Sequence, residues 1–97
     1  MAESSFIEQS KLRFKEGEVV FTKGEMAQQM YVILVGKIRL YAGAEPKGDW
    51  VEELNKGDFF GEGSLLEAIP RANTAVALED TELIAITRGT FLKMIRQ

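Results

Sequence analysis

Residues Phe60 to Thr74, with the sequence FGEGSLLEAIPRANT, carry the side chains best suited to binding chemistry. Gly61 stands at the start of a predicted short helix, where free backbone N–H groups and a partial positive charge favour a phosphate. Arg71 adds a planar, permanently charged group that matches phosphate oxygens. Glu62 repels a phosphate but can accept hydrogen bonds from sugar hydroxyls. Together these three residues indicate a nucleotide with one phosphate charge.

Each of these residues also has a purely structural interpretation. Gly61 can simply follow a turn, and Glu62 can be a first-turn acid that favours the helix dipole by ~0.3–1 kcal/mol. Arg71 can form an ion pair with Glu62 or Glu67. The chain has no G-x-x-x-x-G-K-[ST] pattern here, so a triphosphate loop is not indicated. Only the order of the residues favours a ligand site.

The composition limits the classes of protein to which the chain can belong. Its 97 residues suffice for one hydrophobic core, so we expect a single domain over residues 1–97. The net charge of -3 argues against nucleic-acid binding through overall charge, and no apolar run approaches the ~20 residues that cross a bilayer. With no cysteine and no histidine, the usual metal ligands and the commonest general base are absent. We expect no enzyme, no metal, no cofactor and no membrane segment, and by default a cytoplasmic location.

Short β-strands must position this segment. Apolar or alternating stretches lie between turn residues, which is typical of an all-β sandwich or barrel. The stretch 30–35 is apolar on both faces, which predicts a central, buried strand. In the stretch 37–42, Ile38 and Leu40 face one way and Tyr41 the other, toward solvent. The predicted strands are Lys11–Phe14, Glu18–Thr22, Met30–Val35, Lys37–Ala42, Trp50–Leu54, Thr74–Glu79 and Glu82–Thr87.

Helices are predicted near both ends of the chain. The stretch Ser4–Lys11 has a serine available as N-cap. In the stretch Thr87–Gln97, Phe91, Leu92 and Ile95 have the spacing of an amphipathic helix.

The order of residues from Phe60 to Ala77 resembles the phosphate-binding cassette of the cyclic nucleotide-binding domain family. That family includes bacterial catabolite activator proteins, regulatory subunits of cyclic-AMP-dependent protein kinase and cyclic-nucleotide-gated channels. Upstream, residues 14–41 look like the family's first strands, and residues 54–62 like its approach to the cassette. The residues that match the cassette in type and spacing are Phe60, Gly61, Glu62, Leu65, Leu66, Pro70, Arg71, Ala72 and Thr74.

This resemblance implies a fold and a set of roles. The fold is mainly β, an eight-stranded antiparallel β-roll of jelly-roll type with short helices at both termini and a short phosphate-binding helix. Glu62, supported by the backbone of Gly61, matches the family's acceptor for the ribose 2′-hydroxyl, and Arg71 matches the partner of the phosphate. Ser64 and Ala72 match positions whose backbone N–H groups bind that phosphate, and Leu40 a position that packs on the base. The predicted ligand-binding residues are Gly61, Glu62, Gly63, Ser64, Leu65, Arg71, Ala72, Asn73 and Leu40.

Several cassette positions depart from the family pattern. Gly63 replaces a bulky apolar residue, and glycine loosens a short helix by ~1 kcal/mol relative to alanine. Ser64 replaces the common alanine and can add a hydroxyl donor to the phosphate. Asn73 replaces a small apolar residue and can either reach the ligand or face water. Ala72 stands where members that prefer cyclic GMP often have threonine, so we expect cyclic AMP, with cyclic GMP as the alternative ligand.

The output of such a domain stays open at the level of the sequence. The expected function is a regulatory module that senses a cyclic mononucleotide. The alternative is a β-roll without ligand that serves as a protein-interaction or dimerisation module. A cupin-type metal enzyme is disfavoured because the chain has no histidine. The lid helix of the family is expected to be absent from residues 1–97, which favours micromolar affinity, and either a homodimer or a missing effector domain would be the partner.

Overall fold

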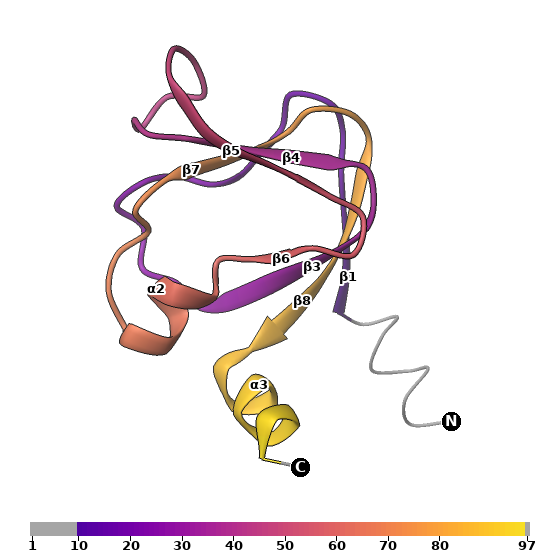
Figure 1. The fold of residues 1–97 in the computed structure, drawn as a ribbon, viewed down its shortest axis with the longest axis vertical. Helices are drawn as coiled ribbons and strands as arrows, with labels where there is room; N and C mark the ends of the chain where they lie inside the picture. The colour runs from indigo at the N-terminus through magenta and orange to yellow at the C-terminus, as the bar shows by residue number, and fades with distance from the viewer. Residues whose placement is uncertain (1–9, 97) are drawn as a thin grey trace.

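Two antiparallel sheets of four strands each make up the fold of this computed structural model, in which residues 10–96 are described (Figure 1). The strands are β1 (Lys11–Phe14), β2 (Val19–Phe21), β3 (Gln29–Val35), β4 (Lys37–Tyr41), β5 (Trp50–Asn55), β6 (Phe59–Phe60), β7 (Thr74–Ala77) and β8 (Thr81–Thr87). The helices are α2 (Glu62–Glu67) and α3 (Arg88–Ile95). One sheet has the order β1-β8-β3-β6 and the other β2-β7-β4-β5. The expected mainly β fold of eight antiparallel strands is confirmed.

Most of the predicted elements are present at the predicted places. The apolar strand β3 lies between β8 and β6, as expected for a central strand. The short strand β6 was not predicted, because its two residues are too few to show an alternating pattern; it pairs with Tyr31 and Val32. Of the helix predicted over Ser4–Lys11, residues 4–9 lie outside the described residues; Ser10 is helical, and Lys11 belongs to β1 instead. Helix α3 is confirmed, and its N-cap Thr87 accepts a hydrogen bond from the backbone N–H of Thr90.

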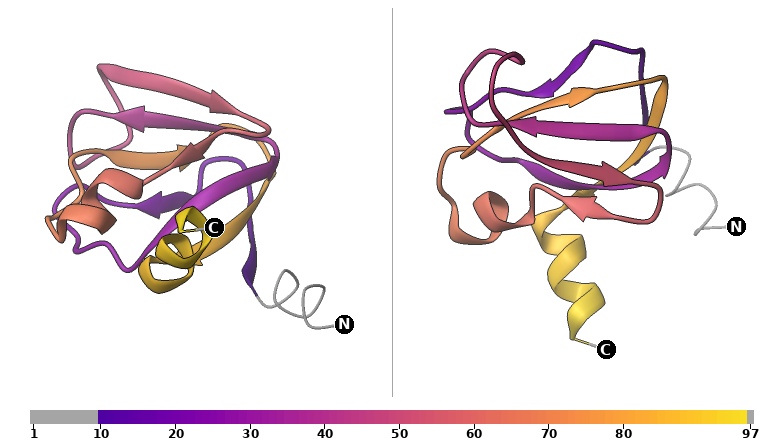
Figure 2. Two further views of the ribbon diagram at one scale, coloured as in Figure 1. Left: turned by 60° about the horizontal axis from the view of Figure 1, so that its bottom comes forward. Right: turned by 45° about the horizontal axis from the view of Figure 1, so that its top comes forward.

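The hydrophobic core lies between the two sheets. Its centre is a group of three aromatic rings, Phe21, Tyr31 and Phe60, whose centroids are 5.2–6.1 Å apart. Aliphatic side chains from both sheets complete it. A second cluster of Met30, Leu65 and Ile86 joins α2 to the sheet that contains β3. These contacts fix α2 at one end of the roll, where both views in Figure 2 show it.

One face of β4 differs from the prediction. Tyr41 is only 8% exposed, whereas the alternation predicted that it faces solvent. Arg39 covers it: its Nη1 donates to the Tyr41 hydroxyl at 3.3 Å, and its Nη2 lies 2.8 Å from Glu53. The Arg39 guanidinium also lies 4.6 Å from the centre of the Trp50 ring. The long Arg39 side chain covers its neighbours, so this face of β4 is half-buried and not fully exposed to solvent as predicted.

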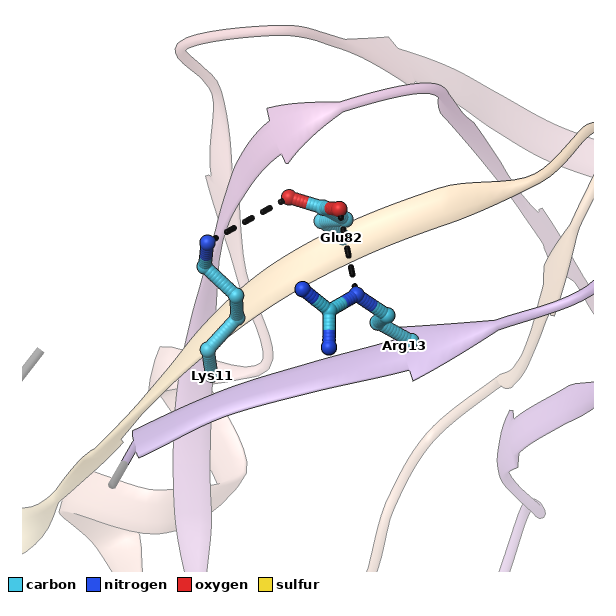
Figure 3. A network of polar contacts seen from close by, with 3 residues as sticks. All are labelled: Lys11, Arg13 and Glu82. Atoms are coloured by element: carbon cyan, nitrogen blue, oxygen red, sulfur yellow. Dashed lines mark hydrogen bonds and ion pairs between the residues drawn. The ribbon is translucent and has the colours of Figure 1, made fainter. Parts of the chain in front are cut away.

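An ion-pair network lies on the surface of the sheet that contains β1 and β8. Glu82 on β8 accepts from Arg13 at 3.2 Å and lies 3.6 Å from the amino group of Lys11, both on β1 (Figure 3). Surface pairs of this kind contribute ~0–1 kcal/mol each.

Among the helices of residues 10–96, none has the length and apolar content needed to cross a membrane.

Candidate functional site

A cavity of 460 Å³ lies beside α2, bordered by strands β4, β5 and β6. This volume is within the ~300–1,000 Å³ that small-molecule sites usually have. Eight of the nine predicted ligand-binding residues line it. They are Leu40, Gly61, Glu62, Gly63, Ser64, Arg71, Ala72 and Asn73. The fold therefore brings residues from β4 and from the segment 60–74 together around one space.

Leu65 is the one predicted residue that does not line this cavity. Its side chain is buried in the cluster with Met30 and Ile86. On α2, Leu65 points toward the sheet while Gly63 and Ser64 border the cavity. The Leu65 side chain therefore anchors the helix and does not border the cavity.

Gly61 has a conformation and a neighbour that both require glycine. Its φ of 81° lies in the left-handed region that side chains disfavour. A Cβ atom at this position would stand 2.7 Å from Nη1 of Arg71. Gly61 is also the N-cap of α2, and no side chain caps the first turn. A small residue here thus lets the arginine approach the backbone closely.

Arg71 is buried against this glycine. The residue is 4% exposed, and its guanidinium lies 4.0 Å from the centre of the Phe21 ring. Nη1 donates to the carbonyl oxygen of Gly61 at 2.7 Å, and Nη2 to that of Gln29 at 2.6 Å. Burial lowers the pKa of the Arg71 guanidinium from its ordinary value, although Tyr31 works in the opposite direction. Because the ordinary pKa of arginine lies far above neutral pH, the group keeps its charge there.

The ion-pair interpretation of Arg71 is wrong for the described residues. Between residues 10 and 96, no carboxylate oxygen lies within 4.0 Å of its guanidinium nitrogens. An arginine has five N–H donors, and two of them serve Gly61 and Gln29. A buried cation with donors to spare and no anionic partner is suited to an anion from outside the chain.

The loop before β3 holds the backbone around Arg71. The N–H of Arg71 donates to the carbonyl of Glu25 at 2.7 Å, and its own carbonyl accepts from Gly24 at 2.9 Å. Thr74, which is fully buried, donates to the carbonyl of Gly43 at 2.7 Å and accepts from the N–H of Lys23 at 3.0 Å. Thr74 therefore positions the segment rather than lining the cavity.

Two other predicted side chains have distinct environments. Glu62 lies in the first turn of α2, as expected, and takes part in none of the ion pairs found between residues 10 and 96. The hydroxyl of Ser64 donates to the carbonyl of Pro70 at 3.4 Å, a long and weak hydrogen bond. The Glu62 carboxylate is thus available as an acceptor, and the Ser64 hydroxyl is only loosely engaged.

Sequence reasoning missed several residues of the cavity wall. Glu52, Phe59, Glu67 and Ile69 also line it. Glu52 could have been found from the hairpin, because β5 runs antiparallel to β4 and Glu52 is the register partner of Leu40. The others depend on how α2 and the following loop turn back over the sheet, which no local pattern specifies.

Comparison with known proteins agrees with this geometry. A family model described as "Cyclic nucleotide-binding domain" matches residues 11–97. The "Cyclic AMP receptor protein" of Thermus thermophilus is 37% identical over 87 residues, which are 87% of this chain and 39% of that protein. "Lysophospholipase NTE1" of Kluyveromyces lactis is 39% identical over 83 residues, 82% of this chain and 6% of that protein.

A solved structure gives the same result for the fold. The crystal structure of the Thermus thermophilus catabolite activator protein has a TM-score of 0.76 and 33% identity, and the match covers 98% of this chain and 46% of that one. The chain thus spans less than half the length of each of these relatives. The similarity covers the domain and not the further parts of those proteins.

Proposed function

The chain belongs to the cyclic nucleotide-binding domain family, and on that premise we propose that it is a regulatory module that binds cyclic AMP in the cavity beside α2. One observation carries the proposal: a buried arginine without an anionic partner in residues 10–96 borders a ligand-sized cavity. Arg71 takes the cyclic phosphate, and Glu62 accepts from the ribose 2′-hydroxyl. The base rests against Leu40.

The position of Arg71 suggests how binding is sensed. Its guanidinium ties Gly61, at the start of α2, to Gln29, at the start of β3. A phosphate that binds the remaining N–H groups of this guanidinium adds a charge-assisted partner beside the two carbonyls. Binding would therefore alter the hydrogen bonds by which Arg71 links the start of α2 to β3. This is a local electrostatic change of the kind that regulatory domains use.

The charges around the cavity favour a singly charged ligand. Three carboxylates, Glu52, Glu62 and Glu67, line it together with the one arginine. A cyclic phosphodiester carries a single negative charge, whereas a phosphomonoester carries nearly two at neutral pH. Like charges repel across such a small site. This supports a cyclic mononucleotide over its linear 5′-monophosphate.

The preference for cyclic AMP over cyclic GMP rests on Ala72. This residue lines the cavity directly after Arg71, and a methyl group offers no hydrogen-bond donor or acceptor. The name of the Thermus thermophilus relative, "Cyclic AMP receptor protein", points in the same direction.

Calorimetric titrations with cyclic AMP and cyclic GMP test the proposal. We expect one-to-one binding, tighter for cyclic AMP, and a higher melting temperature with ligand, because a ligand that binds only the folded state stabilises it. Neither heat nor a melting shift with either nucleotide would instead support the alternative, a β-roll that acts as a protein-interaction module.

A further inference from the structure

Strands β4 and β5 present a pair of inward-facing rows. Ile38 is the register partner of Leu54, and Leu40 that of Glu52, two residues further along. Residues two apart on a strand share a face. Ile38 and Leu54 are buried in the core, and Leu40 and Glu52 both line the cavity. The row therefore changes from two buried apolar partners in the core to a half-buried leucine and an exposed glutamate that both border the cavity.

Glu52 and its neighbour Glu53 are used differently. Glu53 points to the other face of β5 and forms an ion pair with Arg39 at 2.8 Å. Glu52 has no ion-pair partner within residues 10–96. An ionised carboxylate only accepts hydrogen bonds. The cavity thus has an acceptor that the fold itself does not occupy.

We propose that Glu52 accepts a hydrogen bond from the exocyclic amino group of the bound adenine, beside the apolar surface of Leu40. The assignment rests on the proposed function, in which Arg71 and Glu62 take the phosphate and the ribose. The base is then the remaining part of the ligand, and Leu40 and Glu52 are adjacent on the cavity wall. A flat apolar contact with one acceptor beside it fits an aromatic ring that carries an amine.

A structural explanation of Glu52 makes a different prediction. Strand β5 is the edge of its sheet, and inward-pointing charged residues can protect an edge strand from pairing with other chains. In that case, replacing Glu52 changes the self-association of the protein and leaves the ratio of affinities for the two bases unchanged. The chemistry of the base therefore separates the two explanations.

A double-mutant cycle between Glu52 and the base amine is the test. Calorimetry compares cyclic AMP with the 3′,5′-cyclic monophosphate of purine riboside, which lacks the amine, on the wild type and on Glu52→Leu. The wild type should bind cyclic AMP up to about tenfold more tightly than the analogue, because the analogue has no amine to donate a hydrogen bond to the exposed Glu52 carboxylate. Glu52→Leu should bind the two about equally, and Glu52→Gln, which keeps an acceptor, should restore part of the difference.

The control removes the same charge elsewhere. Glu79 is exposed and does not line the cavity, so Glu79→Gln should keep the wild-type ratio. If Glu52→Leu lowered the affinity for both nucleotides by the same factor, the losses from the substitution and from the missing amine would be additive. That result would overturn the role of Glu52 and leave the proposed function intact. If the wild type bound neither nucleotide, the proposed function would fall, and the assignment of Glu52 with it.

Discussion

Replacing Arg71 with alanine should reduce both the stability of the free protein and its affinity for cyclic AMP. The substitution removes hydrogen bonds of 2.7 and 2.6 Å to the carbonyls of Gly61 and Gln29. A hydrogen bond from a charged donor contributes ~1.5–3 kcal/mol. The relief of a buried charge offsets part of this, so we expect a net loss of ~2–4 kcal/mol in the free energy of unfolding.

The loss of binding free energy should be at least as large as the loss of folding stability. Loss of the charged partner of a buried phosphate costs ~2–5 kcal/mol, which lowers affinity by a factor of about 30 to 5,000. Urea denaturation without ligand and calorimetry below the melting temperature measure the two quantities separately. Wild-type affinity in Arg71→Ala would refute the phosphate role, and wild-type stability would refute the tie between α2 and β3.

Arg13 provides the matched control. It is an exposed arginine paired with Glu82 on the outer surface of β1 and β8 (Figure 3). Arg13→Ala removes the same charge from the chain and should cost less than ~1 kcal/mol of stability. Its affinity for cyclic AMP should equal that of the wild type.

Four further substitutions test the remaining parts of the site and its supporting backbone. Glu62→Gln should weaken cyclic AMP but not its 2′-deoxy analogue, and a calorimetric double cycle that shows additive losses would separate Glu62 from the hydroxyl. Gly61→Ala should lose ~1–3 kcal/mol of stability in urea, because of its φ of 81° and the contact with Arg71. Gly63→Ala, with open space around its Cβ position, should gain ~0.5–1 kcal/mol, and equal effects at the two glycines would contradict the backbone argument. Thr74→Val should cost ~1–3 kcal/mol in the same measurement, because the carbonyl of Gly43 loses its donor; unchanged stability would show that this bond contributes nothing.

Local patterns in the sequence were sufficient for most of the fold. Most strands could be predicted because apolar residues alternate or cluster between turn residues. The burial of Tyr41 on β4 could not be predicted, because it depends on where the Arg39 side chain lies. That placement involves Trp50 and Glu53 on a different strand, and no pattern within β4 reports it.

The site was predictable where one continuous segment builds it. Residues 61–73 supply most of the cavity residues named from the sequence, and their order alone indicated a ligand. The partners of Arg71 could not be foreseen: a charged side chain suggests an ion pair, yet it binds the carbonyls of Gly61 and Gln29. Gln29 is 42 positions away in the chain, and only tertiary packing brings it there.

Titration of this chain with cyclic AMP, cyclic GMP and linear 5′-AMP in one calorimetric series tests the central claim most directly. The cavity beside α2 has one buried arginine and three carboxylates, so it should bind a singly charged cyclic nucleotide. We predict one-to-one binding of cyclic AMP, weaker binding of cyclic GMP, and at least about tenfold weaker binding of 5′-AMP. Binding of 5′-AMP as tight as that of cyclic AMP, or no binding of any of the three, would contradict the account.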